Sequence, residues 1–393
     1  MADNKRRRNA VTCTMKRIHT LFAISLLLLV CPSCRRATAQ PDDTTAVAVA
    51  PAKAYSLDEN IGAMLLIGFR GTEVDSSHHV VRDLRDYHVG SVILFDYDVS
   101  TGKRGRNIVS ADQLRSLCRQ LRQYNPRLLI GVDQEGGYVS RLSPRYGFPR
   151  IPTARRLGQM GDDSVRHYAA ATADMLTSVG FNLNFAPVAD VDVNPACPVI
   201  GAIERSFSPD AHEVARLCRL WVDAQRGGGV VSCMKHFPGH GSAHGDTHRG
   251  LVDVTTTWQR SELVPYRDLP ADGLMVMTAH VVNRQLDPSG LPASLSPRIT
   301  ALLRDTLGFD GVIVTDDLAM GAISSHYGFE QAVQMAVLAG ADLLCLSNNG
   351  SHYDTEMVPR AVAAIRRLVD EGRVDADRLR RSADRVRALQ QHE

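Results

Sequence analysis

Charged and polar residues stand directly after short apolar runs along this chain, and their types suit acid, base and nucleophile chemistry. They occur as Asp133-Gln134-Glu135, Asp190, Lys235-His236, His280, Asp316-Asp317 and Ser347. A single Asp at such a position is usually a helix cap. Five runs that end on charged groups are hard to explain by capping. We therefore expect these side chains to converge on one concave polar site.

Two neighbouring carboxylates are candidates for a nucleophile. Asp316 ends a buried apolar run, and Asp317 follows it directly. Successive side chains of a strand point to opposite faces, so only one of the two can face a bound substrate. The sequence by itself leaves open which one does.

A loop rich in glycine and histidine, residues 238–250, is the candidate source of a proton donor. Asp246 and His248 are two residues apart, so one carboxylate can orient and charge one imidazole. His240 and His244 are competitors, and a His-rich loop can also bind a metal. We favour the Asp-His pair, because no third or fourth ligand is spaced for zinc.

Eight apolar runs must position these groups, and we predict that each forms a strand: residues 63–69, 91–95, 128–132, 182–186, 230–234, 274–278, 312–315 and 342–346. Most are separated by apolar residues at helical spacing, such as Val214, Leu217, Cys218 and Trp221. This alternation predicts parallel strands with right-handed crossovers and a single (β/α)8 TIM-type barrel. An open doubly wound sheet is the alternative, disfavoured because no G-x-G-x-x-G follows the first run. In a barrel the polar groups lie at the C-terminal face, where barrel enzymes place their chemistry.

Five segments resemble, in order, the motifs of glycoside hydrolase family 3, and more narrowly its β-N-acetylglucosaminidase branch. They are GVDQEGGYVSRL (131–142), NFAPVADVDVNP (184–195), KHFPGHG (235–241), VMTAHV (276–281) and LGFDGVIVTDDLAM (307–320). The similarity runs over nearly all of residues 55–350. Five ordered motifs make a far more specific signal than any one of them.

The resemblance implies a role for individual residues. Asp316 corresponds to the nucleophile of the family's T-D-x-L-x-M motif, which leaves Asp317 as a structural or helix-starting residue. Asp246 and His248 resemble an Asp-His dyad in which His248 acts first as acid and then as base. The expected ligands of the terminal sugar are Asp133, Arg141, Arg205, Lys235 and His236. Two departures stand out: extra residues precede Arg205 in the family's I-G-x-R-x-F pattern, and Ser242 replaces the Asp that often follows GHG.

The function implied by this resemblance is retaining exo-hydrolysis of terminal β-linked N-acetylglucosamine, from peptidoglycan fragments or related glycans, with no cofactor and no metal. A β-glucosidase-like hexosidase of the same fold is one alternative, but it is expected to lack the Asp-x-His pair. A β-GlcNAc phosphorylase is another, because a histidine donor leaves no resident anion to repel phosphate. A non-catalytic glycan-binding lipoprotein is the third, and the presence of both nucleophile and dyad counts against it. We expect a monomer.

Composition and charge fit an exported enzyme. The chain has 393 residues, 44% hydrophobic and 22% charged, which is enough to bury a sizeable core. Residues 1–39 hold eight Lys or Arg and one acid, so the rest carries a net charge of −5 although the total is +2. A mildly acidic body argues against nucleic-acid binding.

The basic segment precedes an eleven-residue apolar stretch, residues 21–31, which is shorter than the roughly 20 residues that span a bilayer. This pattern is typical of a secretory signal. Two processing sites are possible. Signal peptidase can cleave after Ala37-Thr38-Ala39, before Gln40. Alternatively, the lipoprotein-like Ser33-Cys34 is processed and a lipid on Cys34 attaches the protein to a membrane. We therefore predict an export signal at 1–39, a linker at 40–54, a catalytic barrel at 55–393, and a location in the periplasm or as an outer-membrane lipoprotein. Five cysteines follow residue 39, without C-x-x-C spacing, and we expect most of them to be buried and apolar in role.

Overall fold

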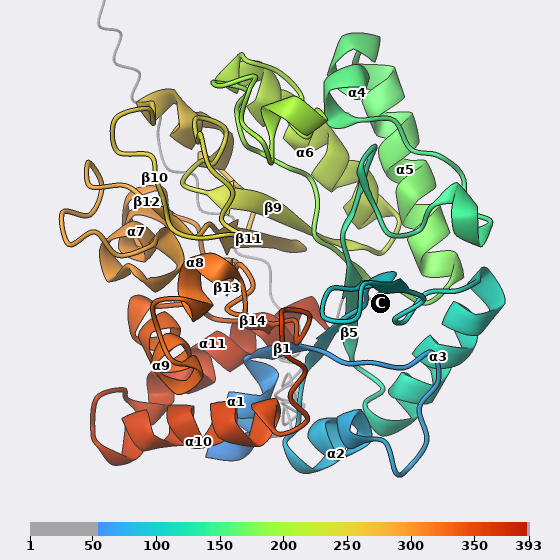
Figure 1. Ribbon diagram of the computed structural model, residues 1–393, viewed down its shortest axis with the longest axis vertical. Coiled ribbons are helices and arrows are strands. Elements are labelled where there is room, and N and C mark those ends of the chain that lie inside the picture. Colours follow the sequence, from blue (N-terminus) through green and yellow to red (C-terminus); the bar gives the residue numbers. More distant parts are fainter. Residues whose placement is uncertain (1–53, 391–393) are drawn as a thin grey trace, which may run out of the picture. The chain divides into compact units, whose positions relative to one another are not determined.

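The computed structural model describes residues 54–390, and its centre is one sheet of eight parallel strands (Figure 1). In sheet order the strands are β13 (Val312–Thr315), β11 (Leu274–Thr278), β9 (Val231–Phe237), β8 (Leu183–Asn184), β5 (Leu129–Val132), β2 (Ser91–Ile93), β1 (Leu65–Gly68) and β14 (Leu344–Leu346). A parallel bridge between Val314 and Leu343 joins the first and last of these. The sheet is thus closed into a barrel, and each of the eight predicted strands overlaps one of those found.

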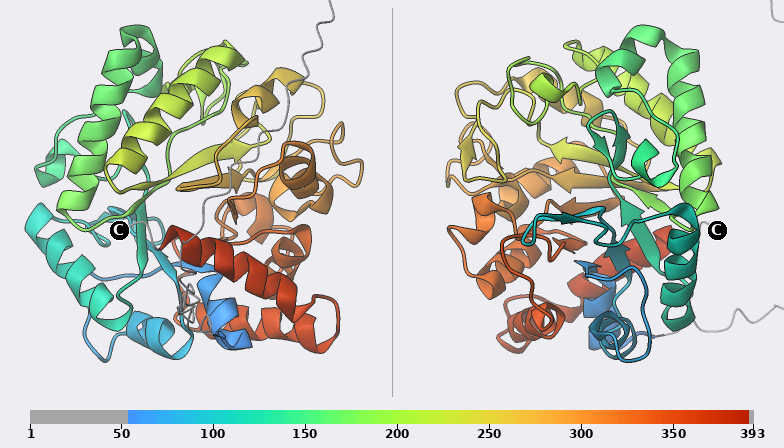
Figure 2. Two further views of the ribbon diagram at one scale, coloured as in Figure 1. Left: turned by 180° about the vertical axis from the view of Figure 1, so that it is seen from behind. Right: turned by 45° about the vertical axis from the view of Figure 1, so that its right-hand side comes forward.

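Helices surround the strands on the outside (Figures 1 and 2). The longer ones are α2 (His79–Asp86), α3 (Ala111–Tyr124), α5 (Asp162–Ser178), α6 (Ala211–Gly227), α9 (Phe329–Ala339), α10 (Met357–Asp370) and α11 (Ala376–Leu389). In α6 the carboxylate of Asp210 accepts the amide of His212, and the apolar positions predicted for this helix are buried. Short helices complete the layer: α1 (Leu57–Ala63), α4 (Ala154–Met160), α7 (Pro297–Ala301) and α8 (Gly321–Ser324).

The strands bury side chains on both faces, as parallel barrel strands do. Odd positions of β9 and β11, for example Cys233 and Met275, pack inside the barrel in one cluster. The alternate positions, such as Met234 and Val276, belong to the cluster between strands and helices. Leu389 of α11 packs on the inner cluster and helps to close that end of the barrel.

Several of the predictions from sequence concern residues outside the described range 54–390. The export signal, Cys34 and nearly all of the linker lie outside residues 54–390, as do residues 391–393 of the predicted barrel. Within 54–390, no helix has the length and apolar character needed to cross a membrane. All five cysteines of this region are buried and free, as predicted for most of them.

Candidate active site

Strand alternation carries three charged side chains into the mouth of the barrel. On β13, Val312 and Val314 face the interior, so the next residue of that face is Asp316. Val231 and Cys233 set the same register for Lys235 on β9. Leu129 does so for Asp133, which directly follows β5. Three of the strand-end groups are therefore directed toward the same end of the barrel interior.

Lys235 is the centre of a buried charge network. Its Nζ lies 2.7 Å from Oδ1 of Asp133 and 2.7 Å from Oε1 of Glu135. Arg205 binds Glu135 with Nε and Nη2 at 2.7 and 2.8 Å, and Arg141 lies 3.6 Å from Oδ2 of Asp133. These five side chains thus form one connected group.

Mutual attraction keeps this network ionised despite its burial. Burial alone would raise the pKa of Asp133 and Glu135, but Lys235 and the neighbouring arginines hold both below their usual values. Burial would likewise lower the pKa of Lys235, and the two carboxylates raise it instead. Lys235 and Glu135 keep only 4% and 5% of their side chains exposed, so a bound ligand meets Asp133 and Arg141, at 16% and 30%, more readily.

His236 is held by a second buried carboxylate, Asp190. Oδ2 of Asp190 lies 2.7 Å from Nδ1 of His236, and its Oδ1 accepts the amide of His240 at 2.7 Å. Burial would raise the pKa of Asp190, but the attraction and hydrogen bond of His236 lower it. Nδ1 of His236 is thus engaged by the carboxylate, and Nε2 is the ring nitrogen left to meet a ligand.

Asp316 is a buried carboxylate surrounded by imidazoles. Burial would raise its pKa, but attraction from His280, His236 and His248 outweighs this and holds the pKa at about 2. Its Oδ1 accepts the amide of Asp317 at 2.8 Å. Asp316 is therefore ionised at any pH near neutrality, as an attacking carboxylate must be.

Asp317 has a different environment from its neighbour. Its carboxylate binds Ser347 at the end of β14, through both the hydroxyl and the amide, the latter at 3.0 Å. It also accepts the amide of Ala319 at 3.2 Å. These bonds tie the segment after β13 to the segment after β14, which is a structural task.

The loop after β9 brings the predicted Asp-His pair to the site. Nδ1 of His248 lies 2.7 Å from Oδ1 of Asp246, which also accepts the amide of His248 at 2.9 Å. The loop packs against α8. Ala322 donates its backbone amide hydrogen to the carbonyl of Thr247. The loop also approaches Gly321 so closely that a Cβ added there would lie 2.6 Å from the carbonyl oxygen of His248. Since α8 follows Asp316 by only a few residues, this packing brings the loop near Asp316, and His248 contributes to lowering the pKa of that carboxylate.

The competing histidines of the loop have other contacts. His240 is buried, its Nε2 lies 3.3 Å from Oγ1 of Thr247, and burial lowers its pKa to about 4. Nδ1 of His244 lies 3.2 Å from Nδ2, the side-chain amide nitrogen, of Asn194. Among residues 54–390, no group of three or more His, Cys, Asp or Glu side chains is arranged to hold a metal ion.

Three residues of the predicted strand-end pattern had no individual role assigned from the sequence. Glu135, Asp190 and His280 all follow strands, so the strand-end pattern contains them, but only their contacts reveal what each one holds. Nδ1 of His280 lies 2.7 Å from the Ser294 hydroxyl, and the ring lies close enough to Asp316 to be the largest favourable influence on its pKa.

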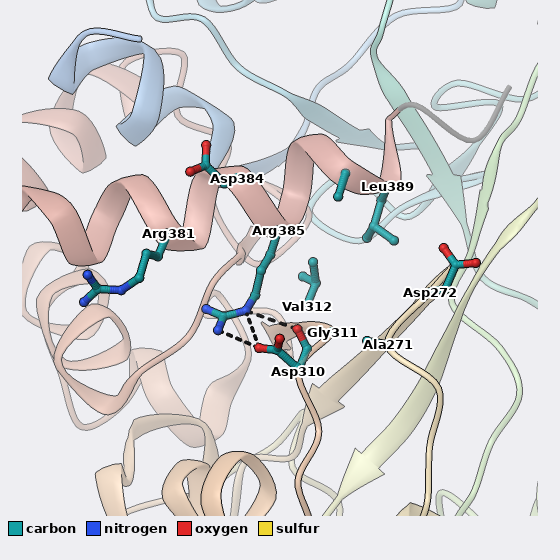
Figure 3. A pocket seen from close by; sticks show the side chains of 11 residues that line it. Ala271, Asp272, Asp310, Gly311, Val312, Arg381, Asp384, Arg385 and Leu389 are labelled. Atoms are coloured by element: carbon teal, nitrogen blue, oxygen red, sulfur yellow. Dashed lines mark hydrogen bonds and ion pairs between the residues drawn. The ribbon is translucent and has the colours of Figure 1, made fainter. Parts of the chain in front are cut away.

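A cavity of about 490 Å³ lies at the opposite end of the barrel (Figure 3). Asp272 and Asp310 precede β11 and β13, and Arg385 of α11 binds Oδ1 of Asp310 at 2.7 Å. None of the residues that line it belongs to the strand-end site. This cavity is therefore separate from the strand-end site.

A closed (β/α)8 barrel with buried carboxylates, a lysine and histidines at the C-terminal ends of its strands is consistent with a glycoside hydrolase. The chain belongs to glycosyl hydrolase family 3, because the family model described as the family 3 N terminal domain matches residues 56–389. This confirms the resemblance inferred from the five motifs.

Individual relatives agree with this assignment. A protein named β-hexosaminidase from Pseudomonas aeruginosa is 34% identical over 310 residues, which cover 77% of this chain and 86% of that one. Another from Alkalilimnicola ehrlichii is 36% identical over 328 residues, covering 80% and 87%.

Two solved structures are similar in fold. That of a family 3 β-N-acetylglucosaminidase from Paenibacillus has a TM-score of 0.77 at 35% identity, and the match covers 86% of this chain but only 63% of that one. That of a β-N-acetylhexosaminidase from Beutenbergia cavernae has a TM-score of 0.74 at 29% identity, covering 86% and 99%.

Proposed function

We propose that this enzyme is a retaining exo-β-N-acetylglucosaminidase that releases terminal non-reducing β-linked N-acetylglucosamine, from peptidoglycan fragments or related glycans, without cofactor or metal. The names of its relatives support the sugar, since they are β-hexosaminidases and β-N-acetylglucosaminidases. The observation that carries the mechanism is the buried carboxylate of Asp316, which three imidazoles hold in its ionised form.

In the first step Asp316 attacks the anomeric carbon and forms a covalent glycosyl-enzyme, while the leaving oxygen takes a proton. Asp316 is suited to this because it faces the barrel mouth and because its pKa of about 2 keeps the carboxylate ionised. Asp317 is not, because the amides of Ser347 and Ala319 donate to its Oδ1 and the Ser347 hydroxyl donates to its Oδ2. Water then attacks the glycosyl-enzyme, which restores the original anomeric configuration.

His248 is the proton donor of the first step and the base of the second. Asp246 binds its Nδ1, so Nε2 is the nitrogen available for proton transfer. The ring keeps 65% of its side chain exposed, which leaves room for leaving groups of many sizes on that side. Asp246 lowers the free energy of the charged imidazolium, as the carboxylate of a catalytic triad does.

The terminal sugar is bound by Asp133, Arg141, Lys235 and His236, which offer one carboxylate and three donors to hydroxyl groups. Arg205 contributes by a different route from the other four. Its guanidinium forms an ion pair with the carboxylate of Glu135, and the ammonium of Lys235 forms an ion pair with the same carboxylate. Arg205 thereby sets the position of the Lys235 ammonium.

A panel of 4-nitrophenyl glycosides tests the proposed activity with purified protein. The β-N-acetylglucosaminide should have the highest kcat/KM, and the β-glucoside and the α-anomer should be poor substrates. Asp316→Asn protein, purified in parallel, controls for contaminating hydrolases. A preference for the β-glucoside would favour the hexosidase alternative, and sugar binding without turnover would favour a glycan-binding protein.

The phosphorylase alternative is separated in the same assay. Addition of phosphate should leave the rate of nitrophenol release unchanged, with free N-acetylglucosamine as the product. Formation of N-acetylglucosamine 1-phosphate would contradict hydrolysis. Activity should also survive prolonged treatment with a metal chelator.

We also propose export of the enzyme to the periplasm or to the outer membrane as a lipoprotein, on the basis of the basic segment and short apolar stretch in residues 1–39. Mass spectrometry of the mature protein from cells should find either a lipidated Cys34 or a free N-terminus at Gln40. An intact Met1 or Met15 in the active pool would contradict export.

A further inference from the structure

A second cavity, of about 500 Å³, opens beside the barrel mouth. It lies between the segment after β2, which includes β4 (Lys103–Arg104), and the hairpin of β6 (Gln134–Gly136) and β7 (Val139–Ser140). We call it the arginine pocket, because Arg104, Arg141, Arg145 and Arg150 line it. Arg141 also contacts Asp133, so the pocket adjoins the proposed site of the terminal sugar.

The arginine pocket carries more positive charge than its own carboxylate neutralises. Asp96 is the acidic residue of its lining, and it is engaged by Nη1 of Arg104 at 2.7 Å and the hydroxyl of Tyr146 at 3.3 Å. Arg145 and Arg150 are exposed, and neither has an ion pair within residues 54–390. Two guanidinium groups are thus free to bind an anion, a task for which their planar donor sets are suited.

The position of the pocket decides which part of a substrate reaches it. In the closed sheet β5 and β13 are four strands apart, so they lie on opposite sides of the barrel. A sugar whose anomeric carbon lies over Asp316 directs its far end, carbons 4 and 6, toward Asp133 and Arg141. The leaving group departs instead past His248, on the loop after β9.

We propose that the arginine pocket binds an anionic group, a phosphate or a carboxylate, carried on the far end of the terminal sugar. This rests on the proposed function, because the direction of the sugar follows from attack by Asp316. Arg145 and Arg150 contact the anion, and the apolar face of a substituent meets the ring of Tyr138, which is 74% exposed beside them.

The test compares three 4-nitrophenyl β-N-acetylglucosaminides: the unsubstituted compound, its 6-O-phosphate and its 6-O-carboxymethyl ether. A fourth substrate carries a carboxylate on the aryl leaving group. The enzymes are wild type, Arg145→Gln/Arg150→Gln, and Arg119→Gln as a matched control, since Arg119 is an exposed arginine of α3 away from the pocket.

For the wild type, kcat/KM should be at least tenfold higher with one or both 6-O-anions than with the unsubstituted compound, and this preference should shrink as salt is added. The double variant should lose most of the preference while its kcat/KM on the unsubstituted compound stays unchanged. Arg119→Gln should behave as wild type. The relative rates with phosphate and carboxymethyl identify which anion the pocket accepts.

Two results would overturn the proposal. One is equal or poorer turnover of both 6-O-anions by wild type, with the unsubstituted compound still hydrolysed. The other is an Arg145 and Arg150 effect confined to the substrate with the charged leaving group, which would place the pocket on the opposite side of the scissile bond. Loss of turnover on every substrate would instead refute the proposed function, so the two failures are distinguishable.

Discussion

Nδ1 of His248 lies 2.7 Å from Oδ1 of Asp246, and this contact leaves Nε2 as the ring nitrogen that can exchange a proton with a substrate. The pair belongs to a loop that packs on α8, directly after the segment containing Asp316. Asp246, His248 and Asp316 are thus held by adjoining parts of the barrel face.

If His248 is the donor, its removal should matter most where the leaving group needs protonation. His248→Ala should lower kcat/KM on phenyl or alkyl β-N-acetylglucosaminides by about 10²- to 10⁴-fold. With a 2,4-dinitrophenyl leaving group, which departs as a stable anion, kcat/KM should fall far less. His167→Ala, an exposed histidine of α5, is the matched control. An equal loss on all leaving groups would make the loop structural and direct attention to His240 and His244.

Asp246→Asn should change the pH dependence of the reaction. Burial would raise the pKa of Asp246, but bonds from the His248 amide and ring lower it, so the carboxylate is charged throughout the neutral range. Its loss removes a negative charge that favours the imidazolium. The alkaline limb of kcat/KM should accordingly move to lower pH, with a smaller loss at the optimum than in His248→Ala. An unmoved limb would argue against electrostatic support of His248 by Asp246.

The two neighbouring aspartates should respond differently to the same substitution. Asp316→Asn removes the attacking charge with almost no change of volume, so turnover should be abolished, with kcat reduced by more than about 10⁴-fold and folding preserved. Asp317→Asn should act mainly on stability, since Ser347 and Ala319 lose part of a structural contact. Circular dichroism melting and nitrophenol release distinguish the two effects. Equal catalytic losses, or a larger one at Asp317, would reverse the assignment.

Glu262 offers a prediction about stability and pH. It lies under the loop that carries His248: a Cβ on Gly239 would come within 2.6 Å of its Oε2. Burial raises the pKa of Glu262 to about 7, although the hydrogen bond from the Gln259 amide opposes this. The folded protein therefore holds a proton that the unfolded chain releases near pH 4.5.

Because the folded state binds the extra proton, stability should fall as pH rises from about 4.5 to 7. The shift corresponds to roughly 3 kcal/mol, at about 1.4 kcal/mol for each pH unit. Glu262→Gln keeps the acceptor for Gln259 and cannot ionise, so its free energy of unfolding relative to wild type should increase over this range. Urea titrations at pH 5 and 8 measure the difference. A relative stability independent of pH would mean that Glu262 is ionised in the folded protein.

The fold could be predicted from sequence because it follows from local patterns, whereas the choice of Asp316 over Asp317 as the proposed nucleophile came from the family resemblance. Apolar runs with buried alternation define the strands, and the same alternation sends Asp316 inward after Val312 and Val314. The contact between Arg205 and Glu135 could not be predicted, since the two are 70 residues apart and the register before Arg205 departs from the family pattern. Glu262 was missed because it lies in a short 3₁₀ helix, Arg260–Tyr266, where no α-helical periodicity indicates burial.

The central claim is that Asp316 forms a covalent bond to the sugar, and trapping that intermediate tests it most directly. A 5-fluoro analogue of an activated β-N-acetylglucosaminide slows breakdown of the glycosyl-enzyme, which peptide mass spectrometry then locates. We predict a single added sugar on the peptide that contains Asp316, with fragment ions placing it on that residue and no adduct in Asp316→Asn. An adduct on Asp317, or a product of inverted anomeric configuration without any adduct, would contradict the account.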